Sequence, residues 1–465
     1  MLYDHKAVHK VIQKIMLKKI KIVMAGAQAT RNSRIDSCEA YFEKVQSRKK
    51  IPQSLQDTLT SAFARIPVSS FPDVPGGKVI EIPADIPIGE AVKVLSDYNI
   101  LAAPVRNTDA ENTKDWRQSY LGIIDYSAVV LWVIETAGHA AAALSASSAA
   151  AVGLGAGAAG TLGALAVGST GPVAVAGLTV AAIGAAVAGG VAADKVMAKD
   201  APTAVDILGE DFYKVILEEE PFKSTTVRSI LNSYRWAPFV PVATDSSMLS
   251  ILLLLSKYRL RNVPVIESGE SHIKNFITQS AVVQGLEKCR GRDWFDCISA
   301  NPISEMGLPF MTPDEVISVQ GDELILQAFE KMKDNEIGGL PVIEGPRKKI
   351  IGNLSIRDIR FLLLKPELFT SFRQLTVKNF MNTIASATQD AGRTVTPITC
   401  KPDTSLGNVI HTLALKSVHR IYVVSGENEV TGVITLRDVI SCFVSEPPNY
   451  FDNYFGVAAH EMLGH

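Results

Sequence analysis

Apolar and polar positions alternate with two different periods along most of the chain. Segments 91–95 and 324–332 carry apolar residues three and four positions apart, which places them on one face of a helix that packs on a sheet. Short runs rich in β-branched residues, VPVI at 263–266 and LPVI at 340–343, predict buried strands. The pattern therefore predicts an α+β fold built of short elements.

One order of elements occurs four times: an extended stretch, a helix, a short apolar strand, a second strand, and a helix opened by a small polar residue. Pro264 and Pro341 occupy the same place in the second and third copies, 77 positions apart, and Tyr422 follows in the fourth copy after 81 more. Pro104, in the first copy, lies 160 positions before Pro264 because an insertion separates these copies. A unit of about sixty residues buries little apolar surface alone. We therefore expect the units to pair.

Composition excludes several classes of protein. The chain has 465 residues, 47% hydrophobic and 20% charged, which is typical of a globular protein with two or three domains. A net charge of -2 gives no basic footprint for nucleic acid. The five cysteines are odd in number and scattered, so the sequence predicts neither a disulfide framework nor a zinc site. This favours a reducing compartment, the cytoplasm or the nucleus.

A motif of the form Gly-x-x-Ser/Thr-x-x-Asp ends the third and fourth copies, at Ser355 and Asp358 and at Thr435 and Asp438. It has two interpretations. The Ser or Thr and the acid can form a capping box at the start of a helix. Alternatively, a carboxylate in the first turn can accept both hydroxyls of a ribose, with the hydroxyl and the helix-terminal amides close to the same ligand.

Comparison of the four copies favours the ligand interpretation. The capping position holds Asp125, Thr278, Ser355 and Thr435, which are all good N-cap residues. Three positions later the copies hold Ala128, Ala281, Asp358 and Asp438. Since two units begin the same helix without the acid, the fold does not require an acid there.

A β-α-β-β-α unit with this terminal motif resembles the CBS domain, and two in tandem resemble a Bateman module. Four in register, with HRIYVV in the last, resemble the gamma regulatory subunit of the AMP-activated/sucrose-non-fermenting protein kinases. The stretch 40–82 and the Ala/Gly-rich insertion are similar to the plant-type form, and the resemblance covers residues 37–454. It implies two Bateman modules stacked into a disc.

The resemblance also implies a function and partners. A gamma subunit is not an enzyme: it docks on a kinase catalytic alpha subunit and a scaffolding beta subunit, coupling nutrient state to phosphorylation. An adenine nucleotide (AMP, ADP or ATP) is the expected regulatory ligand, and no cofactor is required. The chain accordingly lacks HExxH, GxSxG and P-loop motifs.

The resemblance assigns the candidate nucleotide-binding residues. His419 and Arg420 match the phosphate-facing pair of the fourth repeat, although such a pair is also compatible with a solvated turn. The full set is Ser355, Asp358, Thr435, Asp438, His419, Arg420, Arg261 and Thr278.

Two positions depart from the animal-type pattern. Leu101 replaces an Arg of the first repeat, and Arg261 with Asn262 replaces a His-Arg pair of the second. Each change removes or moves a phosphate contact, so the AMP sensing of the animal-type subunit is not carried over to this chain. Arg259 and Arg261 either compensate in part or belong to ordinary surface.

The Ala/Gly-rich insertion has two interpretations. Between Glu135 and Asp194 lie 58 residues without Asp, Glu, Lys or Arg, long enough for two membrane-spanning helices. That interpretation would make the chain a membrane-associated CBS protein regulating transport. The segment is mostly Ala and Gly, with few residues that drive insertion, which favours a mobile or loosely helical insertion instead.

The expected segments follow from these patterns. The basic N-terminus is either an amphipathic membrane-surface helix or an extension upstream of Met24, and we expect it to be mobile. The predicted boundaries are 1–36 for this extension, 37–66 for a pre-CBS segment, 67–136 for CBS 1, 137–200 for the insertion, 201–223 for a return segment of CBS 1, 224–290 for CBS 2, 299–366 for CBS 3, 374–445 for CBS 4 and 446–465 for a C-terminal tail.

Overall fold

The computed structural model describes residues 37–128 and 224–451, apart from gaps at 75, 99, 101, 111–112, 114, 126–127, 234–238, 268–269, 271–272, 360–373 and 389–395. The predictions for the N-terminal extension and the Ala/Gly-rich insertion lie outside the described residues. No helix of the described part is both long and apolar enough to cross a membrane.

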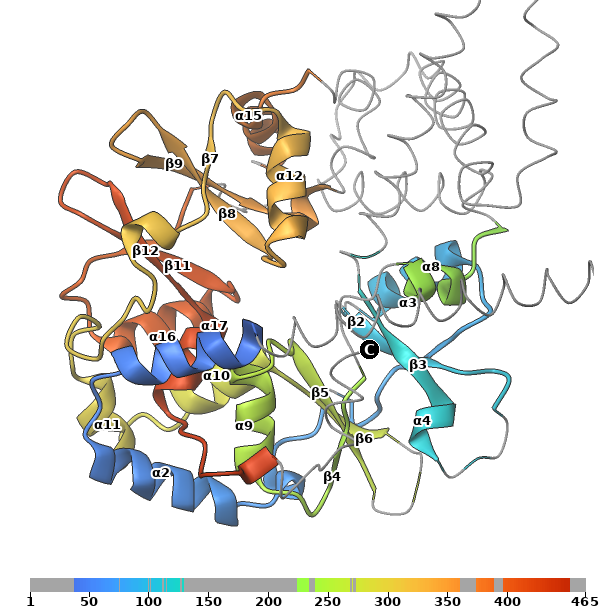
Figure 1. The fold of residues 1–465 in the computed structure, drawn as a ribbon. Coiled ribbons are helices and arrows are strands. Elements are labelled where there is room, and N and C mark those ends of the chain that lie inside the picture. The colour runs from blue at the N-terminus through green and yellow to red at the C-terminus, as the bar shows by residue number, and fades with distance from the viewer. Residues whose placement is uncertain are drawn as a thin grey trace, which may run out of the picture.

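Within the described residues, four three-stranded sheets repeat one topology (Figure 1). In each sheet a two-residue strand pairs in parallel with a longer strand, which pairs antiparallel with the third. A helix joins the first two strands, as the apolar stripes predicted. We call these sheets with their helices units 1 to 4.

Units 1 and 2 form the first half of the chain. Unit 1 contains β1 (Ile82–Pro83), α3 (Ile88–Asp97), β2 (Ala102–Arg106), α4 (Trp116–Ser119) and β3 (Tyr120–Asp125). Unit 2 contains β4 (Val242–Ala243), α9 (Met248–Ser256), β5 (Asn262–Ile266), β6 (Ile273–Thr278) and α10 (Gln279–Glu287). Between them lies α8 (Val227–Ser233).

Units 3 and 4 follow a short connection that contains α11 (Asp293–Ser299) and a 3-10 helix (Pro313–Glu315). Unit 3 contains β7 (Val319–Gln320), α12 (Ile325–Asp334), β8 (Gly339–Glu344), β9 (Lys349–Ser355) and a 3-10 turn (Ile356–Ile359). Unit 4 contains β10 (Thr399–Cys400), α16 (Leu406–Leu415), β11 (Arg420–Val424), β12 (Val430–Thr435) and α17 (Leu436–Cys442). Between them lies α15 (Val377–Thr388).

The segment that leads into each unit packs on the neighbouring unit. Thr226, ahead of unit 2, forms a bridge with Pro87 of unit 1, and Thr376, ahead of unit 4, forms one with Leu324 of unit 3. Helices α8 and α15, which follow these bridges, join the cores of units 1 and 3. These contacts of the leading segments join unit 1 to unit 2 and unit 3 to unit 4.

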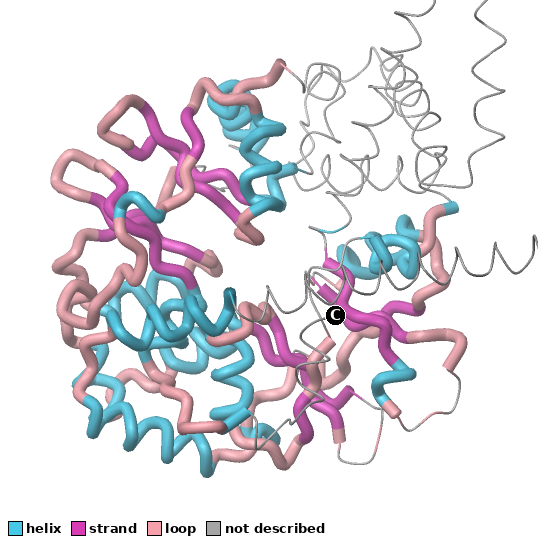
Figure 2. The backbone as a smooth tube through the Cα atoms, viewed as in Figure 1, coloured by secondary structure: helices cyan, strands magenta, loops and turns pink. Residues whose placement is uncertain are grey.

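Apolar contacts between sheets complete the two pairs. Ile123 of unit 1 packs in one cluster with Ile266 and Ile273 of unit 2, and Ile343 of unit 3 packs with Val430 of unit 4. In Figure 2 the strands accordingly fall into two groups, one for each pair. The expected pairing into two modules is confirmed.

The two modules meet through the helices of units 2 and 4. Helices α9, α10, α16 and α17 share one large core, and every residue of α9 is buried, as expected for a helix that is apolar on all sides. The preceding segment joins this core through a helix over residues 37–48 and through α2 (Gln53–Arg65). In Figure 1 the blue helix over 37–48 lies beside α17.

Candidate ligand site

A cavity of about 1190 Å³ opens where the four units meet, and residues of every unit line it. Six of the predicted site residues reach it: Arg261, Thr278, Ser355, His419, Arg420 and Thr435. Asp358 and Asp438 are not among the lining residues. The cavity therefore brings together the predicted cations and hydroxyls but not the predicted acids.

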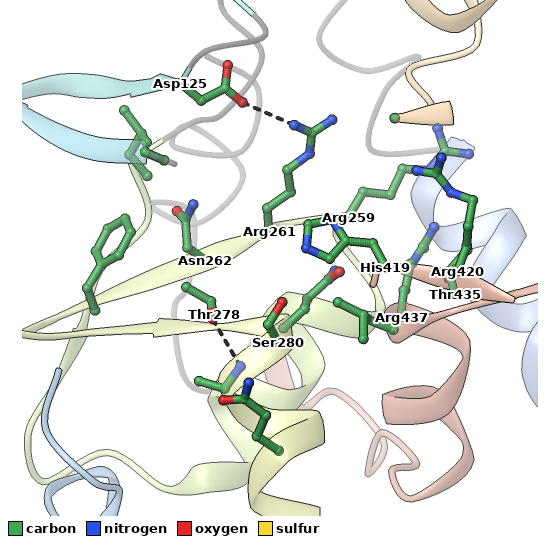
Figure 3. Close-up of a pocket in the computed structure, with 18 of the residues that line it drawn as sticks. Asp125, Arg259, Arg261, Asn262, Thr278, Ser280, His419, Arg420, Thr435 and Arg437 are labelled. Atoms are coloured by element: carbon green, nitrogen blue, oxygen red, sulfur yellow. Dashed lines mark hydrogen bonds and ion pairs between the residues drawn. The ribbon is translucent and has the colours of Figure 1, made fainter. Parts of the chain in front are cut away.

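Cationic side chains of both modules converge on this cavity (Figure 3). Arg259 and Arg261 come from the turn before β5, and His419 and Arg420 come from the equivalent turn before β11 in unit 4. The side chains labelled there that can carry positive charge are those of Arg259, Arg261, His419, Arg420 and Arg437. Positive side chains that face one cavity suit a ligand with negative charge, such as a phosphate ester.

The backbone conformation before these strands is shared among the units. Arg259, Glu336 and Ser417 occupy equivalent positions and have positive φ values of 55°, 52° and 49°. A left-handed conformation in a residue other than glycine costs on the order of 1 kcal/mol. It turns the chain sharply between helix and strand, so Nη1 of Arg259 lies 3.6 Å from Oε2 of Glu336 in the other module.

Arg261 forms an ion pair across the first module. Its Nη1 lies 3.0 Å from Oδ2 of Asp125 at the end of β3. The other oxygen of Asp125 accepts a hydrogen bond of 2.8 Å from the amide of Ala128, which is an N-cap contact. One carboxylate of the chain thus contacts a cation that was expected to face phosphate.

Arg420 lies against a pair of glycines in unit 3. A side chain at Gly339 would overlap the guanidinium of Arg420, and one at Gly338 would lie 3.3 Å from Nη2 of Arg420 and 3.6 Å from Nη2 of Arg261. The two glycines therefore leave room for both guanidinium groups at the start of β8. Close by, the hydroxyl of Tyr422 donates to Oδ1 of Asn353, which ties unit 4 to unit 3.

Arg437 holds the modules together rather than facing the cavity freely. Its Nε donates to the carbonyl of Ser256, and its Nη2 donates to the carbonyl of Lys257 at 3.0 Å. These carbonyls belong to the C-terminal end of α9, where a cation is favourable. Burial lowers the pKa of the guanidinium, but its hydrogen bonds fix it against unit 2.

The two predicted acids occupy capping positions in this structure. Oδ2 of Asp358 accepts a hydrogen bond of 2.7 Å from the amide of Ser355. Oδ2 of Asp438 accepts from the amide and the hydroxyl of Thr435 at 2.8 and 2.7 Å, and the side chain of Tyr41 contacts Oδ1. Burial raises the pKa of Asp438, and the hydrogen bonds from Thr435, which lower it, offset this only in part. A contact with ribose stays a prediction for both acids.

The hydroxyl residues play similar structural roles. Thr278 and Thr435 cap α10 and α17 by accepting from the amides of Ala281 and Asp438 at 3.0 and 3.3 Å. Ser355 precedes a 3-10 turn rather than an α-helix as far as the chain is described. Within the described part, no group of His, Cys, Asp and Glu is placed to hold a metal ion.

Sequence reasoning missed several participants in the cavity, among them Tyr41, Arg437 and the pair of Asp125 with Arg261. Tyr41 lies in the pre-CBS segment, far from the repeats in sequence, and nothing in its local pattern indicates a contact with unit 4. The pair of Asp125 with Arg261 left a weak signal, because Asp125 stands where the other copies have Ser or Thr.

Comparison with known proteins places the fold in a class. Residues 303–365 and 393–445, which contain units 3 and 4 respectively, match the family model of the CBS domain. Units 1 and 2 share the sheet topology of these two matched units, so the chain is a protein of the CBS-domain type. This class confirms the α+β fold expected from the repeats.

Two relatives from Arabidopsis thaliana define the family. The chain is 67% identical over 445 residues to "SNF1-related protein kinase regulatory subunit gamma-1-like", covering 95% of this chain and 100% of that protein. It is 34% identical over 452 residues to "SNF1-related protein kinase regulatory subunit gamma-1", covering 94% and 96%. The chain therefore belongs to the family of regulatory gamma subunits of SNF1-related protein kinases. It is a regulatory subunit and not an enzyme, as predicted.

A solved structure shows a weaker likeness. A protein from Methanocaldococcus jannaschii, described as a putative archaeal homologue of γ-AMPK, aligns with a TM-score of 0.46 and 15% identity over 79% of this chain and 97% of that one.

Proposed function

We propose that this gamma subunit binds an adenine nucleotide in the cavity between its two Bateman modules, within a complex with a kinase catalytic alpha subunit and a beta subunit. The observation that carries the proposal is the convergence of Arg261 from one module and His419 with Arg420 from the other on a single cavity. Cytoplasm and nucleus are the compartments in which such a kinase would act.

The chemistry of the lining matches the parts of a nucleotide. The guanidinium groups of Arg261 and Arg420 suit phosphate oxygens, because their fork of donors can contact two oxygens at once. Thr278, Ser355 and Thr435 bring hydroxyl groups to the same cavity, while Ile317, Pro341 and Val433 give it apolar wall for a base.

A ligand held by cations of both modules would act on the relative position of the modules. It can change the activity of a bound kinase only if it binds two arrangements of the assembly with unequal affinity. Units 2 and 4 share one helical core, so a shift between the modules would be carried mainly by units 1 and 3, which also contribute residues to the cavity.

Calorimetric titration of the purified full chain with AMP, ADP, ATP and adenosine tests the proposal. Replacing Arg261 and Arg420 together by Met should weaken AMP binding at least about tenfold, equivalent to about 1.4 kcal/mol, and leave adenosine unaffected because it has no phosphate. Arg347→Met is a matched control, since Arg347 is 73% exposed and pairs with Glu427 on an outer turn. Equal AMP affinity of the double variant and the control would refute the phosphate assignment.

Co-purification from plant cells tests the assembly independently of the nucleotide. We expect the chain to recover a kinase catalytic subunit and a beta subunit in equal proportions. Recovery of neither, with the chain extracted from membranes only by detergent, would contradict the proposed complex.

A further inference from the structure

The carboxylate of Asp438, expected to hold a ribose, is occupied by the chain itself. The hydroxyl of Tyr41 donates a hydrogen bond of 3.0 Å to Oδ1 of Asp438, and Thr435 occupies Oδ2 through both its amide and its hydroxyl. The acid is 2% exposed. The acid is therefore not accessible to a ligand diol in this arrangement.

Two guanidinium groups hold the ring of Tyr41 in place. The guanidinium carbon of Arg437 lies 4.2 Å from the centre of the ring, and that of Arg259 lies 5.8 Å from it. A cation over the face of an aromatic ring is attracted to it, and the attraction is stronger where water is excluded. Burial also raises the pKa of Tyr41, so its hydroxyl keeps the proton that it donates.

The helix over residues 37–48 is fastened at several further points. Lys49, just after it, donates from Nζ to the carbonyl of Val444 at 2.8 Å and to the hydroxyl of Ser445 at 3.0 Å, beyond the C-terminal end of α17. Lys44 and Arg48 both pair with Glu315 ahead of unit 3. The helix thus contacts both ends of α17, and Tyr41 is aimed at its first turn.

Tyr41 also lines the central cavity, together with Arg259 and Thr435. Its phenol hydroxyl occupies the place where the motif would put a ribose hydroxyl, and its ring fills the approach to that place. A ribose hydroxyl that reached Oδ1 of Asp438 would therefore have to displace the hydroxyl of Tyr41.

We propose that the helix over residues 37–48 covers the ligand position of the fourth unit. The side chain of Tyr41 must move away before Asp438 can bind the diol of a nucleoside. This rests on the proposed binding of adenine nucleotide in the cavity. In the closed arrangement the phosphate is held by the cations, and the ribose hydroxyls contribute little to affinity. Opening the helix would add a diol-specific contact.

The test compares AMP with 2',3'-dideoxy-AMP, which has the same phosphate and base without the diol, by calorimetry on the full chain. The wild-type chain should bind the two within about threefold of each other, and Asp438→Asn should not change this ratio. In Tyr41→Ala the acid is uncovered, so AMP should bind at least about tenfold more tightly than the dideoxy compound, equivalent to about 1.4 kcal/mol. Tyr41→Ala combined with Asp438→Asn should lose that preference.

Glu43→Ala is the matched control, since Glu43 is an exposed residue of the same helix and should keep the wild-type ratio. The inference would be overturned if the wild-type chain preferred AMP over the dideoxy compound tenfold or more and Asp438→Asn abolished this preference. Asp438 would then bind the diol while Tyr41 is still in place. Indifference to the diol in a folded Tyr41→Ala chain that binds AMP would overturn it as well.

Failure of the proposed function looks different. If the wild-type chain binds neither compound but Tyr41→Ala binds AMP, the inference stands and the phosphate assignment falls. If Tyr41→Ala also binds neither, both fall. If Tyr41→Ala does not fold, the ratio of AMP to dideoxy-AMP affinity in the wild type and in Asp438→Asn decides. If Tyr41 covers the carboxylate of Asp438, this ratio should be equal in the two chains.

Discussion

Arg261 and Asp125 form an ion pair of 3.0 Å across the interface of units 1 and 2. The side chain of Asp125 is 11% exposed and that of Arg261 is 40% exposed, so the pair lies at the wall of the cavity and water reaches one partner. An anion that enters the cavity must therefore compete with a carboxylate already in contact with Arg261.

Asp125→Asn should strengthen AMP binding by about two- to tenfold at low salt, because the competing charge is removed. Asn is as good an N-cap as Asp, so the contact with the amide of Ala128 is retained. Calorimetry at two salt concentrations measures the gain, which should shrink at high salt.

The control for this change is Asp85→Asn. Asp85 pairs with Arg228 at 2.7 Å in the same unit and is not among the cavity residues, so AMP binding should not change. Equal effects of the two variants would mean that general charge, and not the partner of Arg261, controls affinity.

Gly339→Ala should displace Arg420 from the cavity wall. The new methyl would overlap the guanidinium and lie 2.7 Å from the carbonyl oxygen of Leu354, which belongs to the backbone and cannot move as a side chain does. We expect AMP affinity to fall by about three- to tenfold, or up to about 1.4 kcal/mol. Gly426→Ala, in a turn with nothing within 4 Å of the added methyl, should leave the titration unchanged.

Lys49 should make stability depend on pH. Burial lowers its pKa from 10.5 to about 8, so between these values the unfolded chain binds more protons than the folded one. The free energy of unfolding then rises with pH across this window, by at most about 1.4 kcal/mol per unit for one group. Below about pH 8 both states are protonated and this slope disappears.

Urea denaturation at pH 7.5, 9 and 10 measures this slope. Lys49→Met should remove the contribution, so the wild-type chain should gain more stability with pH than the variant does. Lys50→Met, at the exposed neighbouring position, should keep the wild-type slope. Parallel pH profiles for the wild type and Lys49→Met would contradict the assignment.

Much of the fold could be predicted from local patterns. The runs at 263–266 and 340–343 lie in β5 and β8, and the apolar stripe at 324–332 became α12 packed on its sheet. The packing of each leading segment on the neighbouring unit could not be predicted in the same way. Bridges such as Pro87 with Thr226 join residues far apart in sequence, and no local period encodes them.

The site was predictable to the extent that it is repeated. His419 and Arg420 were located by their place in the fourth copy, and they do line the cavity. The environment of Asp438 could not be found by that route, because Tyr41 is 397 positions away and lies outside the repeats. Repeats reveal equivalent positions, whereas a contact made by only one copy requires the packed structure.

Arg437→Met should weaken the joint between the modules. Arg437 lies beside Asp438 in α17 and donates to the carbonyls of Ser256 and Lys257, so its loss leaves buried acceptors unsatisfied and removes the cation above Tyr41. Such a change costs about 2 to 4 kcal/mol, although Met preserves part of the packing.

Chemical denaturation measures this loss, and amide exchange locates it. Protection should fall at the C-terminal end of α9 and in the helix over 37–48, while the sheet of unit 3 should be unaffected. Arg347→Met, at an exposed pair on an outer turn, should cost no more than about 0.5 kcal/mol. A loss in Arg437→Met as small as this, with α9 fully protected, would mean that the apolar core of units 2 and 4 alone holds the modules together.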